Sequence, residues 1–133
     1  MLLHSDSLTE MRNAVRDWVE MLAHSRFDDA ANAVASSESQ CSASILREAI
    51  GRYSRRFREA SADDKWQFFP VITSPTEIDT QGENMVVYVK RNMATIEYDL
   101  PIAGQWSDLT AKFCVEKTEP SGFELSLTDI RVL

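Results

Sequence analysis

The stretch that decides the fold is Asp99-Leu-Pro-Ile-Ala-Gly-Gln-Trp-Ser-Asp-Leu-Thr-Ala111, which has Ala103-Gly104 near its centre. A two-residue hairpin turn at these positions would place Tyr98 opposite Leu109 and Asp99 opposite Asp108. Side chains alternate between the two faces of a strand, so the apolar residues of both arms then share one face and the polar residues the other. The stretch therefore predicts an antiparallel hairpin with one apolar face.

The same alternation continues on both sides of this hairpin, so residues 85–133 are typical of one antiparallel meander. Turns are expected near Arg91–Met93 and near Pro120, where turn-forming residues interrupt the alternation. After Leu127 the apolar positions change parity and resume at Ile130. An extra residue in one strand produces such a change, which predicts a β-bulge near Thr128-Asp129.

Before the meander, apolar residues recur at helical spacing. This periodicity predicts helices over Leu8–His24, Arg26–Ala35 and Ser44–Ala60, and Trp66–Ile72 is typical of a short, irregular or edge strand. Helices followed by an antiparallel sheet make an α+β domain. We expect one domain over residues 1–133, with three N-terminal helices packed on one face of a four- to five-stranded antiparallel meander.

Composition and charge exclude several function classes. The formal net charge of -7 argues against nucleic-acid binding, which needs a basic surface. Two separate cysteines and two scattered histidines predict no metal site, and the four glycines are not spaced as a phosphate-binding loop, so no cofactor is expected. The N-terminus lacks the pattern of a signal peptide, and no apolar run is long enough to span a membrane. We therefore expect a cytoplasmic protein with no membrane partner.

One constellation could carry catalysis. Two carboxylates opposite each other, here Asp99 and Asp108, would share a proton if they were buried and could then act as acid and base. Their neighbours Glu97, Thr110 and Lys112 are polar, which favours two solvated carboxylates instead. Ser107 lacks the glycine pattern of a nucleophile elbow. The sequence therefore assigns no catalytic residue.

Three groups of residues are candidates for binding. The polar face of the meander should present several carboxylates to a basic partner, and a run of arginines on the third helix could bind an acidic or phosphorylated one, although Glu48 and Arg52 also fit a solvated ion pair at i,i+4. Tryptophan and tyrosine side chains could line a pocket, or could simply pack. The partner-binding candidates are Glu97, Asp99, Asp108, Glu116 and Glu124; the alternative basic patch is Arg52, Arg55 and Arg56; the pocket candidates are Trp18, Tyr98 and Trp106.

The order of three helices and a long, bulged meander resembles the cone-shaped ketosteroid-isomerase-like (nuclear transport factor two-like) superfamily. The resemblance covers nearly the whole chain but rests on element order alone. It implies either an isomerase or lyase with a pocket between sheet and helices, or a non-catalytic binding module. The isomerases use a tyrosine on the first helix, where this chain has Trp18 and no tyrosine. No catalytic residue carries over.

A second resemblance covers about the last third of the chain. Asp99-Leu-Pro, Gln105-Trp-Ser-Asp-Leu-Thr-Ala and the ending Leu127-Thr-Asp-Ile-Arg-Val look like a group of small uncharacterised bacterial proteins. Such proteins are often encoded near contact-dependent or polymorphic toxin systems. The resemblance implies a toxin-immunity protein.

Three functions fit these observations. The first is a small cytoplasmic binding protein without catalysis, of the immunity type, whose acidic body neutralises a cationic toxin. The second is a small-molecule-binding or isomerase/lyase-type cone domain. The third is an oligomer, such as a homodimer, whose sheet face is the interface. The sequence favours the first because it shows no catalytic set.

Overall fold

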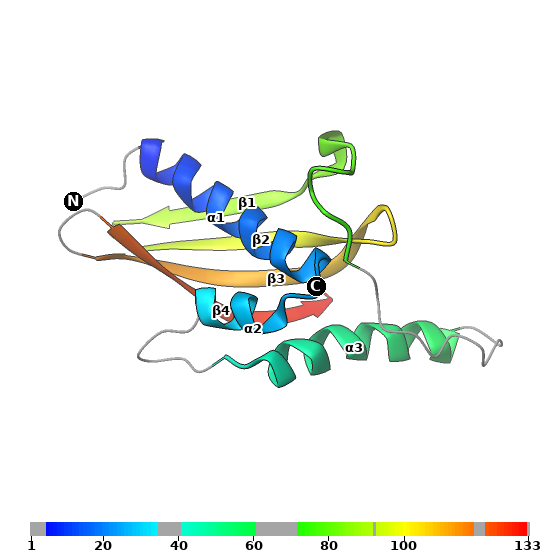
Figure 1. The fold of residues 1–133 in the computed structure, drawn as a ribbon. Coiled ribbons are helices and arrows are strands. Elements are labelled where there is room, and N and C mark those ends of the chain that lie inside the picture. Colours follow the sequence, from blue (N-terminus) through cyan, green and yellow to red (C-terminus); the bar gives the residue numbers. More distant parts are fainter. Residues whose placement is uncertain (1–4, 35–40, 61–71, 92, 119–121, 133) are drawn as a thin grey trace.

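The computed structural model describes residues 5–34, 41–60, 72–91, 93–118 and 122–132. Three helices precede a four-stranded antiparallel sheet, as the α+β prediction requires. The helices are α1 (Ser5–Ala23), α2 (Phe27–Val34) and α3 (Ala43–Ala60), followed by a short 3-10 helix, η1 (Thr80–Gly82). The strands are β1 (Met85–Lys90), β2 (Met93–Ile102), β3 (Gln105–Thr118) and β4 (Gly122–Val132), in the spatial order β1-β2-β3-β4. Figure 1 shows α1 crossing the sheet diagonally, with α2 over β4 and α3 along the β4 side.

The first two helices form because each buries one apolar stripe. Met11, Val15, Val19 and Leu22 of α1 face the core. The helix ends at Ala23, one residue before the predicted end, because Ser25 adopts a left-handed backbone with φ 59°. The amides of Ser25 and Arg26 then donate to the carbonyls of Leu22 and Met21, at 3.0 and 2.8 Å. This Schellman arrangement satisfies the last carbonyls and turns the chain directly into α2.

The β2–β3 hairpin has the predicted turn and faces but a different register. Ala103 and Gly104 have φ of 51° and 79°, and Ile102 pairs with Gln105. Beyond a shift between Asp99 and Pro101, however, Tyr98 lies opposite Ala111 rather than Leu109, and Asp99 lies opposite Thr110 rather than Asp108. The shift is two residues, an even number, so the strands beyond it keep their predicted faces; only within the shifted segment does a predicted polar-face residue, Asp108, change side.

Pro101 and Ser107 explain why the register shifts. Proline has no N–H to donate to the ladder, which weakens regular pairing beside it. The Ser107 hydroxyl donates to the Leu100 carbonyl at 2.6 Å and accepts from the Leu109 amide at 3.2 Å. A side chain thus satisfies backbone groups that a regular ladder would pair.

The predicted bulge in β4 is confirmed at Thr128. Lys112 pairs with Asp129 but Phe113 pairs with Leu127, which leaves Thr128 as the extra residue. Its hydroxyl donates to the Lys112 carbonyl at 2.9 Å. The bulge turns Ile130 onto the apolar face, where it is only 8% exposed.

The core lies between the three helices and the apolar face of the sheet, and α3 contributes the buried Leu46 and Ile50. Trp18 stands edge-on to Phe113, with ring centroids 5.0 Å apart, and its indole N–H donates to the Ala30 carbonyl at 3.0 Å. Among the described residues no buried side-chain nitrogen or oxygen lacks a hydrogen-bond partner. Of the predicted strand Trp66–Ile72 only Ile72 is described, and it forms a single bridge with Ile102. The described sheet therefore has four strands.

Candidate binding surface

The sheet has a second face that points away from the helices, and we call it the open face. Its side chains alternate with the core residues along each strand, so they share one surface. Tyr88 and Met93 are 57% and 47% exposed there. The open face consists of Val86, Tyr88, Lys90, Met93, Thr95, Glu97, Asp99, Thr110, Lys112, Cys114, Glu116, Glu124, Ser126, Asp129 and Arg131.

Charges of both signs occupy the middle of the open face. Lys112 lies between Glu97 on one neighbouring strand and Asp129 on the other, so charge alternates across three strands. Arg131 contacts Asp129, with 3.3 Å between Nε and Oδ2. Opposite charges on adjacent strands stabilise a sheet. The negative charge of Glu97 is therefore balanced by Lys112 on the adjacent strand.

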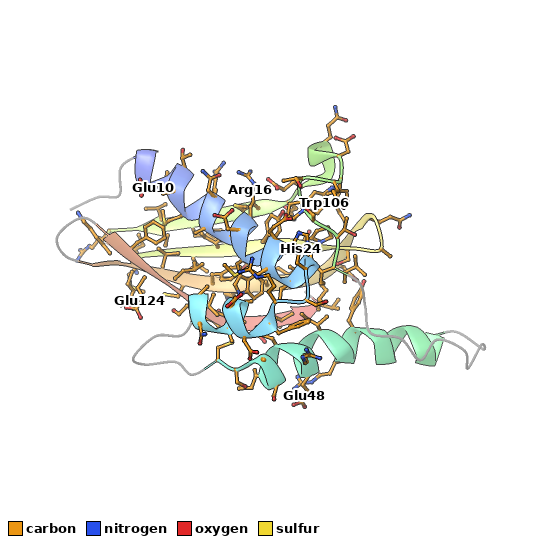
Figure 2. All side chains as sticks on the ribbon, viewed as in Figure 1. Glu10, Arg16, His24, Glu48, Trp106 and Glu124 are labelled. Carbon is orange, nitrogen blue, oxygen red and sulfur yellow. The ribbon has the colours of Figure 1, made fainter. Side chains whose placement is uncertain are left out.

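One end of the open face holds an uncompensated acidic pair. Glu116 and Glu124 lie directly opposite each other on β3 and β4, and among the described residues neither carboxylate has an ion-pair partner. On its other side Glu116 is paired with the exposed Met93. Like charges directly opposite destabilise a sheet. Figure 2 shows Glu124 at the end of the sheet far from Trp106.

A hollow of about 420 Å³ lies near the centre of the open face, beside the bulge. Two cations, Lys112 and Arg131, and the hydroxyls of Thr95 and Thr128 line it. Asp129 and Cys114 complete the polar lining, so the hollow mixes donors and acceptors. Among the described residues, no cluster of three or more histidine, cysteine or acidic side chains could hold a metal ion.

Asp99 and Asp108 do not form the acidic pair that a regular hairpin would give. Asp99 accepts hydrogen bonds from Thr110 Oγ1 at 2.7 Å and from Asn84 Nδ2 at 2.9 Å. Asp108 accepts one from the Tyr53 hydroxyl of α3 at 2.6 Å. Each carboxylate thus has its own donors, and the two are not positioned to share a proton as an acid–base pair. Asp108 also leaves the set of carboxylates on the open face, since it contacts a helix.

The three aromatic residues named for a pocket have separate packing roles. Trp18 and Tyr98 are 1% and 0% exposed, so neither presents surface to a water-sized space. The Trp106 ring stands edge-on to Tyr98 at 6.0 Å and donates its N–H to the Asp79 carbonyl at 2.8 Å. A Cβ on Gly82 would lie 2.3 Å from the Trp106 ring, so only glycine admits the indole so close to the chain.

Arg16, Glu83 and Tyr98, whose ring packs against Trp106, form a polar network that the sequence does not reveal. Glu83 accepts from Arg16 Nη2 at 2.7 Å, from Arg16 Nε at 3.2 Å and from the Tyr98 hydroxyl at 3.0 Å. The hydrogen bond from Arg16 is the main cause that lowers the pKa of Glu83, and burial is the main cause that raises the pKa of Tyr98. No local pattern joins residues so far apart in the chain.

A second cluster contains a serine, a glutamate and a histidine but lacks the order needed for nucleophilic catalysis. Glu20 accepts from the Ser74 hydroxyl at 2.5 Å and lies 2.8 Å from His24 Nε2. The serine hydroxyl therefore points at the carboxylate and not at the imidazole that would have to take its proton. The Ser74 hydrogen bond is the main cause that lowers the pKa of Glu20. The hydrogen bond between Ser74 and Glu20 thus connects the segment around Ser74 to α1.

The alternative basic patch lies on α3. Arg52 is exposed and reaches Glu48 at 3.3 Å, which is the solvated i,i+4 ion pair that the sequence allows. Arg55 and Arg56 lie on the same helix, and their side chains are outside the described part of the structure. Within the described residues, this patch thus consists of the exposed Arg52, which pairs with Glu48 of the same helix.

Comparison with family models, with curated proteins and with solved structures gave no match to this chain. Within the described residues, no helix is both long enough and apolar enough to cross a membrane.

Proposed function

We propose that this chain is a cytoplasmic, non-catalytic binding protein that holds a basic protein partner on the open face of its sheet. The immunity type, in which a cationic toxin is the partner, suits this chemistry. The observation that carries the proposal is the opposition of Glu116 and Glu124 beside the exposed Met93. The family resemblance of the last third of the chain is consistent with it.

The acidic pair gives a physical reason for binding. Two opposed carboxylates repel each other in the free protein. An arginine or lysine from a partner, placed between Glu116 and Glu124, would replace that repulsion with two charge-assisted hydrogen bonds. Met93 offers an adjacent apolar contact, and binding hot spots commonly combine a central apolar anchor with charged neighbours. The net charge of -7 would speed the encounter with a basic partner.

The rest of the structure supports binding over catalysis. The two aspartates that could have formed an acid–base pair are held apart by separate donors. The serine of the Ser74 cluster contacts a carboxylate instead of a base. The described residues thus offer no arrangement in which a nucleophile and its base meet.

A cone domain of the ketosteroid-isomerase type, with a small-molecule pocket between helices and sheet, is the second candidate. The observation in its favour is the polar group of Arg16, Glu83 and Tyr98 at one end of that interface. A ligand there would have to displace Trp106 from Gly82. Binding of a small molecule would then quench or shift tryptophan fluorescence, whereas a partner on the open face would leave Trp106 unchanged.

The test of the main proposal uses a cationic nuclease, in a catalytically inactive form, as the basic binding probe in calorimetry. The double variant Glu116→Lys, Glu124→Lys should bind at least about tenfold more weakly, since charged hot-spot changes commonly have effects of this size. The double variant Glu10→Lys, Asp17→Lys is the matched control, because it changes two exposed acids on α1 by the same charge. Equal losses in both variants, or no loss in the first, would refute the assignment of the open face.

A further inference from the structure

Strand β1 is one edge of the sheet and, among the described residues, pairs only with β2. Its side chains Tyr88 and Val89 are 57% and 44% exposed, on opposite faces of the strand. Figure 1 shows β1 at the outer side of the sheet, beyond β2. An edge strand presents a row of N–H and C=O groups that can pair with another strand.

The hairpin geometry fixes which groups of β1 face outward. Lys90 pairs with Met93 across a two-residue turn, and such a pair exchanges backbone hydrogen bonds. Because such pairs alternate along an antiparallel ladder, the backbone groups of Tyr88 and Val86 also bond to β2. The hydrogen bond from the Asp99 amide to the Asn84 carbonyl, at 3.2 Å, fits this alternation, since Asn84 lies two residues before Val86. The N–H and C=O groups of Met85, Val87 and Val89 therefore point away from β2.

The two edges of the sheet differ in how they are protected. The β4 edge has the Thr128 bulge and the charged Asp129 and Arg131, and it contacts α2 and α3. Bulges, charges and covering helices all prevent pairing between sheet edges. In β1 the pairing with β2 is unbroken, proline is absent, and Lys90 at the end is the one charged residue. Within the described part of the chain, the β4 edge is thus protected and the β1 edge is open.

We infer that two copies of this chain pair through β1, antiparallel about a two-fold axis at Val87, to form one continuous sheet. In this register Val87 faces Val87 of the second copy, and about six backbone hydrogen bonds form between the outward groups. Tyr88 lies across from Val86 of the second copy on the open face. Val89 lies across from Met85 of the second copy on the helix side. Both exposed apolar side chains of β1 are covered in this way.

Charge favours a second copy in this antiparallel direction. Lys90 ends β1, and Asn84 precedes it and donates to the Asp99 carboxylate at 2.9 Å. The two-fold places Lys90 opposite Asn84 of the second copy, with that copy's Asp99 one strand further in the same row. The same contact occurs twice by symmetry. A parallel arrangement would instead bring the two lysines together.

The first test is sedimentation velocity at about 0.15 M salt, over protein concentrations from about 1 μM to about 1 mM, because a short edge contact gives a concentration-dependent dimer. The wild type should change from monomer to dimer. Tyr88→Lys places a cation beside the axis and should raise the dimer Kd at least about tenfold. Ile45→Lys is the matched control, since it adds the same charge at a similarly exposed apolar residue on α3, on the β4 side of the sheet, and it should leave the Kd unchanged.

Amide hydrogen exchange tests the register without any substitution. The amides of Val87 and Val89 should exchange slowly in the concentrated sample and quickly in the dilute one, whereas the Tyr88 amide, bonded to β2, should be protected in both. A wild type that stays monomeric throughout the concentration range would overturn the inference. So would a dimer whose Val87 amide exchanges freely, or one that Ile45→Lys disrupts as strongly as Tyr88→Lys.

Discussion

Arg16 and Glu83 form a two-point ion pair that joins the first helix to the segment before β1. Nη2 and Oε1 are 2.7 Å apart, and Nε and Oε2 are 3.2 Å apart. The Glu83 side chain is 11% exposed, and Tyr98 donates to the same carboxylate. One acidic group thus links the helical layer to the sheet, which makes its ionisation a determinant of stability.

The first prediction is a loss of stability in acid that depends on Glu83. Its pKa in the folded protein lies below the ordinary value of 4.5, so its contribution is present above about that pH. The contribution is then lost as the pH falls through the lowered value. Urea unfolding of the wild type and of Glu83→Gln, measured at several pH values, should give curves of stability that converge in acid. At pH 7 the variant should be less stable by about 1–3 kcal/mol.

The exposed Glu77 provides the control for this prediction. Glu77→Gln should reproduce the pH dependence of the wild type, since no cation holds that side chain in the described structure. If Glu83→Gln also keeps the wild-type slope in acid, the ion pair contributes nothing to the linkage.

Phe113→Ala should cost about 3–5 kcal/mol of folding free energy. The ring is fully buried and packs edge-on against Trp18, so truncation leaves a cavity at the centre of the core. Ile45→Ala on α3 is the comparison, because Ile45 is 52% exposed and should change stability by less than about 0.5 kcal/mol. Similar unfolding midpoints for the two variants would place Phe113 outside the core.

Tyr53→Phe should lower stability by about 1 kcal/mol, since it removes the hydrogen bond from α3 to the Asp108 carboxylate. Tyr88→Phe makes the same chemical change at an exposed position and should have almost no effect in dilute solution. Guanidinium unfolding would measure both. Equal effects would show that the Tyr53 hydroxyl adds nothing to the docking of α3.

Glu116→Gln should raise the unfolding temperature at low ionic strength, because it removes the repulsion across from Glu124. The gain should disappear in about 1 M salt, where charges are screened within about 3 Å. The same variant should bind the basic partner more weakly. A lower melting temperature at low salt would mean that the two carboxylates do not repel.

Much of the fold follows from patterns that act locally. The parity change at Ile130 predicts the bulge because one extra residue is the simplest way to bring that side chain back to the core. The register beyond Asp99 could not be predicted, since it depends on the Ser107 hydroxyl bonding to Leu100 and Leu109. The sequence does not indicate that a serine side chain in a strand will form hydrogen bonds that backbone groups of the partner strand normally make.

The candidate surface is predictable only in outline. Alternation places Glu97, Asp99, Glu116 and Glu124 on one face, and all four lie there. Asp108 does not, because the enlarged hairpin directs it to Tyr53 on a helix distant in sequence. Which carboxylates remain uncompensated depends on register, and therefore on contacts between strands.

The two irregularities of this sheet impose different limits on how related sequences can diverge. Loss or gain of a residue pair at Ser107-Asp108 would leave every later side chain on its own side, so length variation in steps of two should be tolerated there. Deletion of Thr128, the extra residue of the bulge, would instead leave Asp129 opposite Lys112 and Ile130 opposite Ala111, so a gap of one residue there removes the bulge and keeps every side chain on its face. Distant homologues should therefore show gaps of two residues at the hairpin and of one residue at the bulge, a rule that residue similarity alone does not contain.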